Sequence, residues 1–597
     1  MNLAVWVLAA ASLLASGELF RHRRVSTYLA AAGALFEGHW LLLALVSRWL
    51  PLLAQTAVFW AGAAAVGALW LWQIQQWQRP AAGDAVRNVV RREAAVLLVL
   101  LPVFVSAWVV VSMNGLQADG SIALRGFYNG DTVTLAALTE KARLTDGAVR
   151  ANPFAADTEL EYPTLVHGAL AAFLAAIGWR GPVLFVLPGL TLLHVLIIVP
   201  LLFLLWDVYW PEPGDQAAGA ASPAWQAWMG VPSRWMVSAG QAALTLFVLM
   251  GMWDNFIYPQ THFFLNGLFL MLVCLLLRGF LWLAQPLALI LLLSNAVTGT
   301  VAAVLAAAAF LLRAVTHGEG KQKRSVFAAA GLLWLLFIPL LGAGESGFGW
   351  PQFYYSAAFS FSHTVPILLL LLPGVFLFGE RFRLPGLAVG MLLALAAVTF
   401  VFSTRAIVAE NASRFADHAI LLALPLLLPP AIQLAYWLRQ RLWHEAAVPD
   451  VLLGRRLMAV ALGIVLLLPA GVSTASAYDN LLLTAPRIIS SDTQQVLAVL
   501  AAKAPQGARV AAAPYEPFSV PLLTGRSLIR TDDYWLSPQD ELLATLRAAF
   551  AGDAASQARI ANEADYVLLT AEEQHHWDVR GYEQVASQGD ISLYRFR

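Results

Sequence analysis

The sequence predicts a mainly α, polytopic membrane protein of about 14 transmembrane helices, followed by a C-terminal soluble α/β domain. Of its 597 residues, 59% are hydrophobic and only 12% are charged, whereas soluble globular chains carry about 25% charged residues. Apolar runs long enough to cross a bilayer recur along the chain, and the density of charge rises sharply after residue 473. These observations exclude an ordinary soluble enzyme, a disordered chain and a fibrous protein.

The apolar runs define the expected spans, because a helix needs about 20 mostly apolar residues to cross a membrane. We expect them near residues 3–20, 27–49, 52–74, 94–113, 181–206, 234–252, 258–278, 280–296, 297–315, 326–342, 364–379, 384–402, 418–438 and 457–473. The first three form an additional N-terminal region, residues 1–93. The others form a transmembrane domain, residues 94–473.

Arginine and lysine set the expected orientation of these helices. The basic residues cluster in short loops at 21–24, 79–92, 321–324, 381–383 and 439–456. Cytoplasmic loops carry the excess of Lys and Arg, and an N-terminus on the outside puts every one of these clusters in the cytoplasm. We therefore expect a multi-pass protein of the cell (inner) membrane, with residues 114–180 and 474–597 on the periplasmic face.

The first large outer loop, residues 114–180, contains a short apolar stretch at 164–177. This stretch is too short to span comfortably, and an additional span would place three later basic clusters outside. We therefore expect an interfacial or re-entrant helix there.

The tail, residues 474–597, has the composition of a soluble domain. It holds 15 Asp/Glu and 10 Lys/Arg in 124 residues, or about 20%, against about 10% in the preceding 473 residues. Helical spacing at 492–502 and 540–550 alternates with strand patterns at 509–513, 566–569 and 591–596, which predicts a small α/β domain. Lys+Arg and Asp+Glu both number 37, so no charge argument favours a nucleic-acid partner. The expected partner is the lipid bilayer.

The segment Gly126-Phe-Tyr-Asn-Gly-Asp131 directly follows the span at 94–113 and its short connection. A carboxylate just outside a membrane helix suits a general base or a metal ligand at the interface. Alternatively, Asp131 is the N-cap of a helix over 132–142.

Further along the same loop, Asn152-Pro-Phe precedes Glu159-Leu-Glu161-Tyr162-Pro-Thr-Leu-Val-His167. Proline in a first helical turn would place the two glutamates near the N-terminus of the short helix. His167, one turn in, is either a packed polar residue or part of a site.

Later outer segments carry further candidates. Asp254 and Gln260 lie in one of them, and Asp254 is either a site residue or a helix cap. His363 lines either an acceptor cleft or a wet interface. Arg405 and Arg414 suit a lipid phosphate because a guanidinium binds its oxygens bidentately, although a charge anchored at the headgroups gives the same pattern.

This order of features, over residues 94–597, resembles the GT-C superfamily of integral-membrane glycosyltransferases, which use polyprenyl-phosphate-linked sugars. The group includes protein O-mannosyltransferases, aminoarabinose transferases and oligosaccharyltransferases. The resemblance implies a hexosyl- or pentosyltransferase whose acceptor is a glycan, a lipid or a protein. It matches Asp131 to the essential acidic residue of the first outer loop and Asp254 to an acidic residue of the next one. Arg414, and behind it Arg405, would bind the lipid phosphate, and the substrate-lining candidates are Glu161, Tyr162, His167, Gln260 and His363.

The chain departs from the family in two respects. The usual acidic pair of the first loop is reduced to Asp131 preceded by Gly130, so participation of a divalent cation such as Mg²⁺ or Mn²⁺ stays open, with Asp131 as its ligand if there is one. No other cofactor is expected. The three helices of residues 1–93 have no functional account.

Three alternatives stay open. An O-antigen ligase-like or polymerase-like membrane enzyme would rely on outer arginines and a histidine, and not on Asp131. A transporter would place its polar residues at mid-membrane and often repeats its halves, and neither feature is evident here. A non-catalytic scaffold of envelope polysaccharide assembly would show no sugar transfer at all.

Overall fold

The computed structural model describes residues 84–145, 149, 151–160, 165–209, 265–316, 321–342, 383–402, 485–514, 518–532 and 537–596, with isolated residues at 33, 34, 38, 61, 64, 241, 242, 245, 246, 249, 414, 415, 417–419, 421, 422, 481 and 482. The expected spans 3–20, 364–379 and 457–473 lie outside these residues. Those at 27–49, 52–74, 234–252 and 418–438 contain only isolated described residues.

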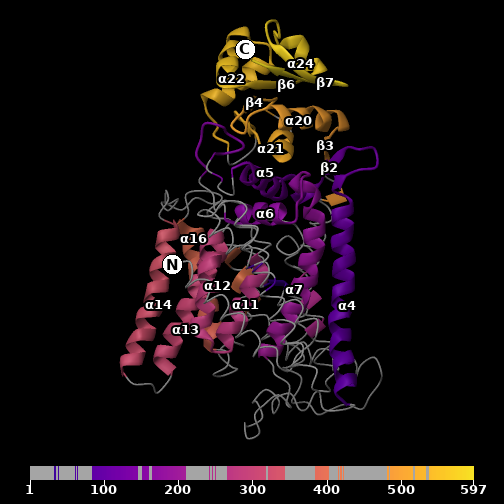
Figure 1. Ribbon diagram of the computed structural model, residues 1–597. Coiled ribbons are helices and arrows are strands. Elements are labelled where there is room, and N and C mark those ends of the chain that lie inside the picture. The colour runs from indigo at the N-terminus through magenta and orange to yellow at the C-terminus, as the bar shows by residue number, and fades with distance from the viewer. Residues whose placement is uncertain are drawn as a thin grey trace.

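A group of upright helices lies below the C-terminal domain in the view of Figure 1. Three stretches are long and apolar enough to cross a membrane: Glu93–Ser112 in α4 (Asp84–Ser112), Leu187–Tyr209, which is α7, and Val297–Val315 in α13 (Ala296–Thr316). Leu98 and Leu101 of α4 are 66% and 67% exposed. A continuous apolar face of this kind suits contact with lipid.

The remaining upright helices are α11 (Asn266–Leu277), α12 (Leu281–Ser294), α14 (Lys321–Gly342) and α16 (Arg383–Phe402). The expected break between the helices at 280–296 and 297–315 is confirmed. Asn295 interrupts them, and its side-chain oxygen accepts hydrogen bonds from the backbone N–H groups of Val297 and Thr298 at 2.9 and 3.0 Å. Such a bond satisfies the otherwise unpaired donors at a helix start.

Two helices begin earlier than the apolar pattern predicts. α4 begins at Asp84 instead of residue 94, and α14 begins at Lys321 instead of residue 326. Both extensions are polar and contain arginine or lysine, which are good helix formers. Hydropathy marks where a helix can enter lipid, and not where its hydrogen bonding starts.

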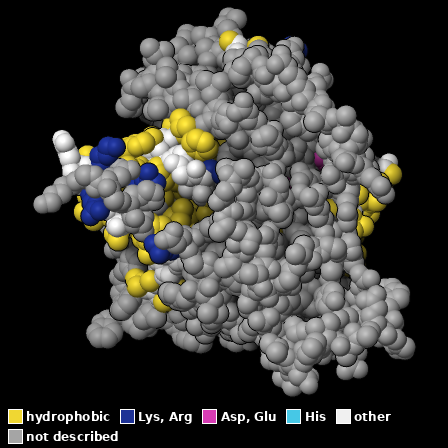
Figure 2. Space-filling model, turned by 90° about the horizontal axis from the view of Figure 1, so that it is seen from below, with side chains coloured by type: hydrophobic (Ala, Val, Ile, Leu, Met, Phe, Trp, Pro, Cys, Tyr) yellow, Lys and Arg dark blue, Asp and Glu magenta, His cyan; other side chains and the backbone are white. Residues whose placement is uncertain are grey.

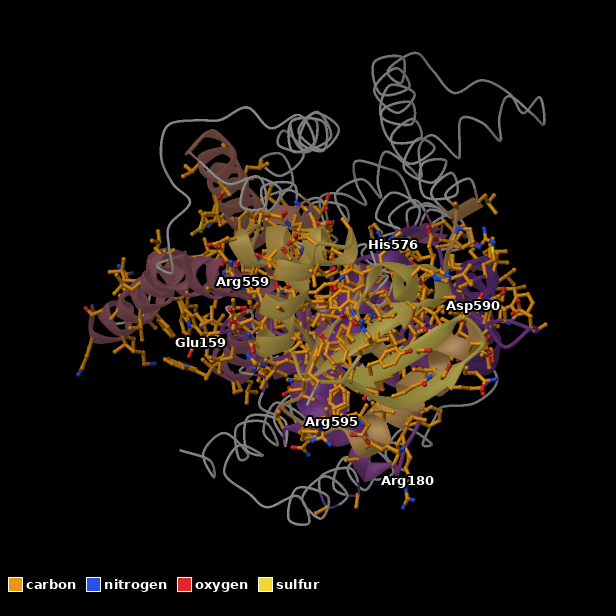
Figure 3. All side chains as sticks on the ribbon, turned by 90° about the horizontal axis from the view of Figure 1, so that it is seen from above. Glu159, Arg180, Arg559, His576, Asp590 and Arg595 are labelled. Atoms are coloured by element: carbon orange, nitrogen blue, oxygen red, sulfur yellow. The ribbon has the colours of Figure 1, made fainter. Side chains whose placement is uncertain are left out.

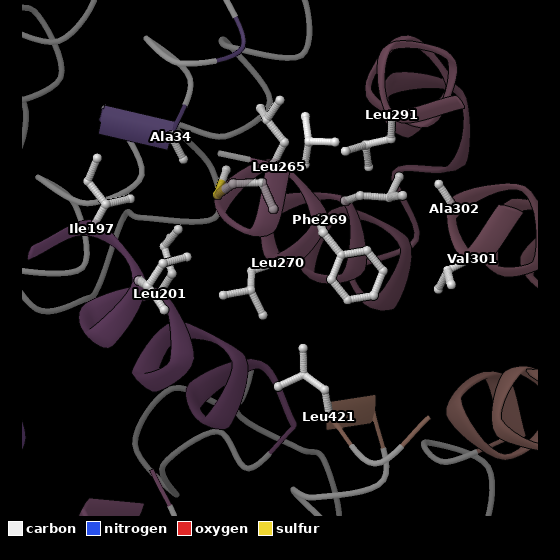
Figure 4. Close-up of a cluster of buried hydrophobic side chains, with 14 of the residues drawn as sticks. Ala34, Ile197, Leu201, Leu265, Phe269, Leu270, Leu291, Val301, Ala302 and Leu421 are labelled. Atoms are coloured by element: carbon white, nitrogen blue, oxygen red, sulfur yellow. The ribbon is translucent and has the colours of Figure 1, made fainter. Parts of the chain in front are cut away.

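The core of the upright bundle joins segments that lie far apart in the chain. Phe269 of α11 lies at its centre with 1% of its surface exposed, and Figure 4 shows the surrounding side chains. They include Ala34, Ile197, Leu201, Leu265, Leu270, Leu291, Val301, Ala302 and Leu421.

Two helices of the first outer loop lie across the ends of the upright helices (Figure 1). They are α5 (Asp131–Leu144) and α6 (Leu165–Ala176), and the short 3₁₀ turns η1 (Gly126–Asn129) and η2 (Val183–Phe185) precede α5 and α7. The bounds of α6 agree with the stretch 164–177, which was too short for a span. α6 packs against α5 and lies across the upright helices, as expected of an interfacial helix.

A three-stranded antiparallel sheet joins this loop to the C-terminal tail. Its strands are β1 (Gly115–Leu116), β2 (Ile122–Leu124) and β3 (Arg487–Ile489), with β2 in the centre. Ile122 pairs with Ile489. The tail is therefore attached to the outer loop from its first strand onward.

The tail itself is an α/β domain, as predicted. Its five-stranded sheet has the order β5-β4-β6-β8-β7, with β5, β4 and β6 parallel and the other pairs antiparallel. The strands are β4 (Arg509–Ala511), β5 (Ser527–Leu528), β6 (Tyr566–Thr570), β7 (Glu583–Gln588) and β8 (Ile591–Arg595). The helices are α20 (Ser491–Lys503), α21 (Ser519–Thr524), α22 (Glu541–Phe550), α23 (Ala554–Glu563) and α24 (Ala571–His576).

Alternate residues of β6 explain the layering of this domain. Leu568 packs in a cluster with α20, while Val567 and Leu569 pack in a second cluster with α22 and α23. Successive side chains of a strand point to opposite faces, so helices cover both sides of the sheet. Seen from above, Arg559 of α23 and Asp590 of the β7–β8 turn lie at two ends of the domain (Figure 3).

Basic residues lie at the end of the bundle away from this domain. Arg313 is in the last turn of α13, and Lys323 and Arg324 are in the first turn of α14. Figure 2, seen from below, shows lysine and arginine gathered beside exposed apolar side chains. The described basic helix ends and the C-terminal domain thus lie at opposite ends of the bundle, as the orientation argument requires.

Candidate functional site

The candidate site begins at Asp131, the first residue of α5. Gly130 is the N-cap of this helix and makes no side-chain cap hydrogen bond. The alternative interpretation of Asp131 as N-cap is therefore wrong, because the helix starts one residue earlier than that interpretation requires. In the first turn, a carboxylate interacts favourably with the helix dipole.

The side chain of Asp131 is open to solvent on one side and surrounded by protein on the others. Its side chain keeps substantial solvent-accessible surface, yet protein surrounds it on most sides, and this burial raises the pKa of the carboxyl above its usual value. The positive charge of Arg414 opposes that rise and lowers the pKa. Asp131 is thus reachable from solvent while lying in a medium that makes its carboxylate a stronger base.

Arg414 is the second predicted site residue in this place. It is partly buried, and its guanidinium interacts electrostatically with Asp131 although the two residues lie in outer segments far apart in the sequence. The structure therefore brings together the acidic residue and the preferred phosphate ligand of the sequence argument. A carboxylate beside a guanidinium can accept a proton and stabilise an anion within one site.

His418, which the sequence pattern did not predict, also belongs to this site. Its Nδ1 lies 2.7 Å from the carbonyl oxygen of Arg414, one helical turn earlier. Its ring meets that of Phe269 edge to face, with centroids 5.0 Å apart and planes at 89°. The available signal was the four-residue spacing from Arg414, which places two residues on one face of a helix.

His167 has a supporting position. It is fully buried in α6, and its ring lies against the backbone of Leu135 in α5. Burial lowers the pKa of His167 to about 4, so the ring is neutral at physiological pH. Of the two interpretations, the geometry favours a packed polar residue that supports α5 one turn beyond Asp131.

The other predicted site residues lie outside the described part of the chain. These are Glu161, Tyr162, Asp254, Gln260, His363 and Arg405. Glu159 is described and exposed, and its backbone forms a bridge with Ala151.

The sequence left open whether Asp131 is a ligand of a divalent cation. Within the described residues, Asp131 belongs to no group of three or more His, Cys, Asp or Glu side chains. The positive charge of Arg414 lowers the pKa of this carboxyl. Participation of a divalent cation therefore stays a prediction.

The C-terminal part of α5 is tied to the segment that precedes α7. The Glu140 carboxylate accepts hydrogen bonds from Arg143 at 3.0 and 3.2 Å and from the backbone N–H of Val183, in η2, at 2.5 Å. Arg143 also donates to the carbonyl oxygens of Trp179 and Gly181. Burial raises the pKa of Glu140 to about 7, although Arg143 opposes the rise. These contacts fix α5 to the segment that leads into α7.

Another face of α5 is tied to the C-terminal domain. The buried ammonium of Lys141 donates to Ser527 Oγ of β5 at 2.9 Å. Burial, together with the nearby charge of Arg526, lowers the pKa of Lys141 to about 8. One helix thus carries Asp131 at its start and is held from two sides further along.

A second contact joins the loop and the C-terminal domain. The backbone of Leu528 exchanges hydrogen bonds with Pro153 and Ala156, both at 2.9 Å. Phe154 and Phe518 meet edge to face with centroids 5.7 Å apart. The Asn152-Pro-Phe motif therefore serves as a docking segment for the C-terminal domain.

Comparison with known proteins adds nothing to this geometry: no family model and no curated protein matches the chain. The resemblance to GT-C enzymes therefore stays a prediction.

Proposed function

We propose that the chain is an integral-membrane glycosyltransferase of the GT-C type. It transfers a sugar from a polyprenyl-phosphate-linked donor to a glycan, lipid or protein acceptor at the outer face of the cell membrane. The observation that carries this proposal is the electrostatic interaction between Asp131 and Arg414. Among the described residues, three helices are long and apolar enough to cross a membrane. Asp131 begins α5, which lies across the ends of the upright helices. This arrangement supports access by a lipid-linked substrate.

The reaction uses each of the two groups once. The acceptor hydroxyl oxygen attacks the anomeric carbon of the donor, and its proton passes to the carboxylate of Asp131. The bond between the anomeric carbon and the phosphate oxygen breaks, and its electron pair leaves with the polyprenyl phosphate. Arg414 stabilises the charge on that phosphate, where a planar guanidinium binds two oxygens at once.

The enclosed position of Asp131 suits the role of base. A carboxyl whose pKa is raised by burial holds a transferred proton more firmly than an exposed one, while Arg414 keeps enough of it ionised. In this proposal Asp254 is a second acidic residue, Arg405 a second phosphate ligand, and Glu161, Tyr162, Gln260 and His363 line the substrate. His167 acts through the position of α5.

The test is sugar transfer by the purified full-length protein in lipid nanodiscs, with radiolabelled polyprenyl-phosphate sugars. Asp131→Asn should lower the rate by about 10²–10⁴-fold, the usual contribution of a positioned base. Asp119→Asn is the matched control, because Asp119 lies in the same outer loop and bonds only locally to Ser121. Its rate should equal that of the wild type.

The outcomes separate the alternatives. Wild-type transfer by Asp131→Asn, together with loss of transfer by His363→Ala and Arg405→Ala, would favour the O-antigen ligase-like enzyme. Absence of transfer from every donor by the wild-type protein would leave a transporter or a scaffold. Arg414→Lys should retain part of the activity that Arg414→Ala loses, because lysine keeps the charge but not the two-pronged geometry.

A further inference from the structure

His418 is held in a single orientation by two contacts. Its Nδ1 lies 2.7 Å from the carbonyl oxygen of Arg414, and its ring meets Phe269 edge to face. Phe269 is itself 1% exposed in the bundle core, so the imidazole ring packs against a buried side chain. A side chain fixed in this way presents its remaining nitrogen in one direction.

The bond to Arg414 also fixes the tautomer of the neutral ring. A carbonyl oxygen only accepts hydrogen bonds, so the proton of the neutral imidazole is on Nδ1. Its Nε2 is therefore an unprotonated acceptor. A protonated ring would put a second positive charge one turn from Arg414, where like charges repel.

This Nε2 has no hydrogen-bond partner within the described part of the chain, whereas His418 as a whole keeps accessible surface. The field of Arg414 reaches both Asp131 and the imidazole. Four residues of helix separate Arg414 from His418 by about 6 Å along the axis. A sugar bonded to a phosphate held by Arg414 lies within such a distance.

We propose that His418 Nε2 accepts a hydrogen bond from a hydroxyl group of the donor sugar while Arg414 binds the phosphate to which that sugar is attached. This inference rests on the proposed function and assigns the sugar-recognition contact to a particular atom. Sugar hydroxyls are hydrogen-bond donors, and a neutral Nε2 recognises one without repelling the adjacent guanidinium. His418 then contributes to donor selection and Arg414 to binding of the lipid phosphate.

The test compares decaprenyl phosphate with decaprenyl-phosphate-linked mannose, glucose and arabinose, each titrated onto the full chain in nanodiscs. In the wild type, at least one sugar-bearing lipid should bind more tightly than decaprenyl phosphate. His418→Asn keeps a donor at the position of Nδ1 and removes Nε2. It should leave decaprenyl phosphate binding unchanged and weaken the preferred sugar lipid about 3- to 10-fold, the worth of one hydrogen bond.

His418→Gln supplies an acceptor near the position of Nε2 and should restore part of that preference. It also serves as the second variant if His418→Asn does not fold. The wild type should bind one deoxy analogue of the preferred sugar lipid more weakly than the sugar lipid itself, by the same factor. The His418→Asn variant should bind that analogue as tightly as the complete sugar lipid. If the substitution and the missing hydroxyl weaken binding independently, so that their effects add, a group other than His418 binds the hydroxyl.

Two results would overturn the inference: a sugar preference that persists undiminished in both His418 variants, or a wild type that binds decaprenyl phosphate as tightly as every sugar lipid. The proposed function fails differently. If decaprenyl phosphate binds equally well to the wild type and to Arg414→Ala, the phosphate role of Arg414 is wrong, whatever His418 does.

Discussion

Arg530 of the C-terminal domain donates a hydrogen bond from Nη2 to Asp157 Oδ2 of the first outer loop at 3.0 Å. A second bond joins Nη1 to the other oxygen of the same carboxylate. Arg530 also donates to Asp540, the N-cap of α22, at 2.7–3.1 Å. The side chain of Arg530 is only 4% exposed, so two carboxylates from separate parts of the fold satisfy one buried guanidinium.

Loss of this guanidinium should loosen the C-terminal domain from the loop. Removing one member of a buried ion pair costs 3–5 kcal/mol, and we expect about 2 kcal/mol for Arg530→Ala because its partners are partly exposed. Limited proteolysis should then release the C-terminal domain faster than from the wild type. Arg580→Ala is the control, since its pair with Asp578 is on the surface, and equal proteolysis of both variants would contradict the prediction.

Close packing between α21 and α5 should make Gly525 sensitive to substitution. Its φ is +66°, and a Cβ atom there would lie 2.9 Å from the Glu140 carbonyl oxygen and 2.8 Å from Leu144 Cδ1. Gly525→Ala should therefore lower the midpoint of thermal unfolding, through both strain and displacement of α5. Gly507→Ala, which meets nothing within 4 Å, should leave it unchanged. A wild-type midpoint for Gly525→Ala would show that the helices do not pack this closely.

Stability should fall as the pH rises from about 4.5 to 7 because of Glu140. Its pKa is about 7 in the folded protein, against 4.5 for a free glutamate, so the folded state binds the proton more tightly than the unfolded state. The stabilisation is complete below pH 4.5 and is lost as the pH rises to about 7, on the order of 3 kcal/mol in total.

Glu140→Gln removes this titration and should flatten the fall in the thermal midpoint over that range. The control is Glu159→Gln, an exposed glutamate of the same loop, which should retain the wild-type slope. An unchanged slope in Glu140→Gln would assign the dependence to another group.

The rate of sugar transfer should rise with pH through the pKa of Asp131, because only the ionised carboxylate accepts a proton. Burial raises this pKa and Arg414 lowers it, so Arg414→Ala should shift the acidic limb of kcat/KM to higher pH, besides lowering the rate. The profile is measured on the residual activity of the variant. If the acidic limb of kcat/KM falls at the same pH in the wild type and in Arg414→Ala, the limb reports the titration of a residue other than Asp131.

The sequence was most informative where one local pattern decides the structure. The helices at 492–502 and 540–550 and the strands at 566–569 and 591–596 were found within three residues. Each of the two helices buries one periodic face, and each of the two strands is a short run of mostly buried residues. The strand Glu583–Gln588 was missed. It has no regular apolar alternation, and it lies at the edge of the sheet beside β8, where polar side chains are tolerated.

The charged contacts of α5 could not be found in the same way. Glu140 and Lys141 are consecutive and charged, which is typical of an exposed helix face, yet both are buried. The groups that cover them, at Val183 and Ser527, belong to distant segments. For the site, the order of motifs was sufficient to propose Asp131 and Arg414. His418 can be recognised as a site residue only once its hydrogen bond to the Arg414 carbonyl is known.

The position of α5 between two neighbours has a mechanical consequence. Glu140 attaches it to η2 on the membrane side, and Lys141 attaches it to β5 on the other. Because both attachments are on α5, a displacement of the C-terminal domain should also move Asp131 at the start of this helix. A protein that binds this domain would then control the position of the proposed base without contacting the apolar upright helices.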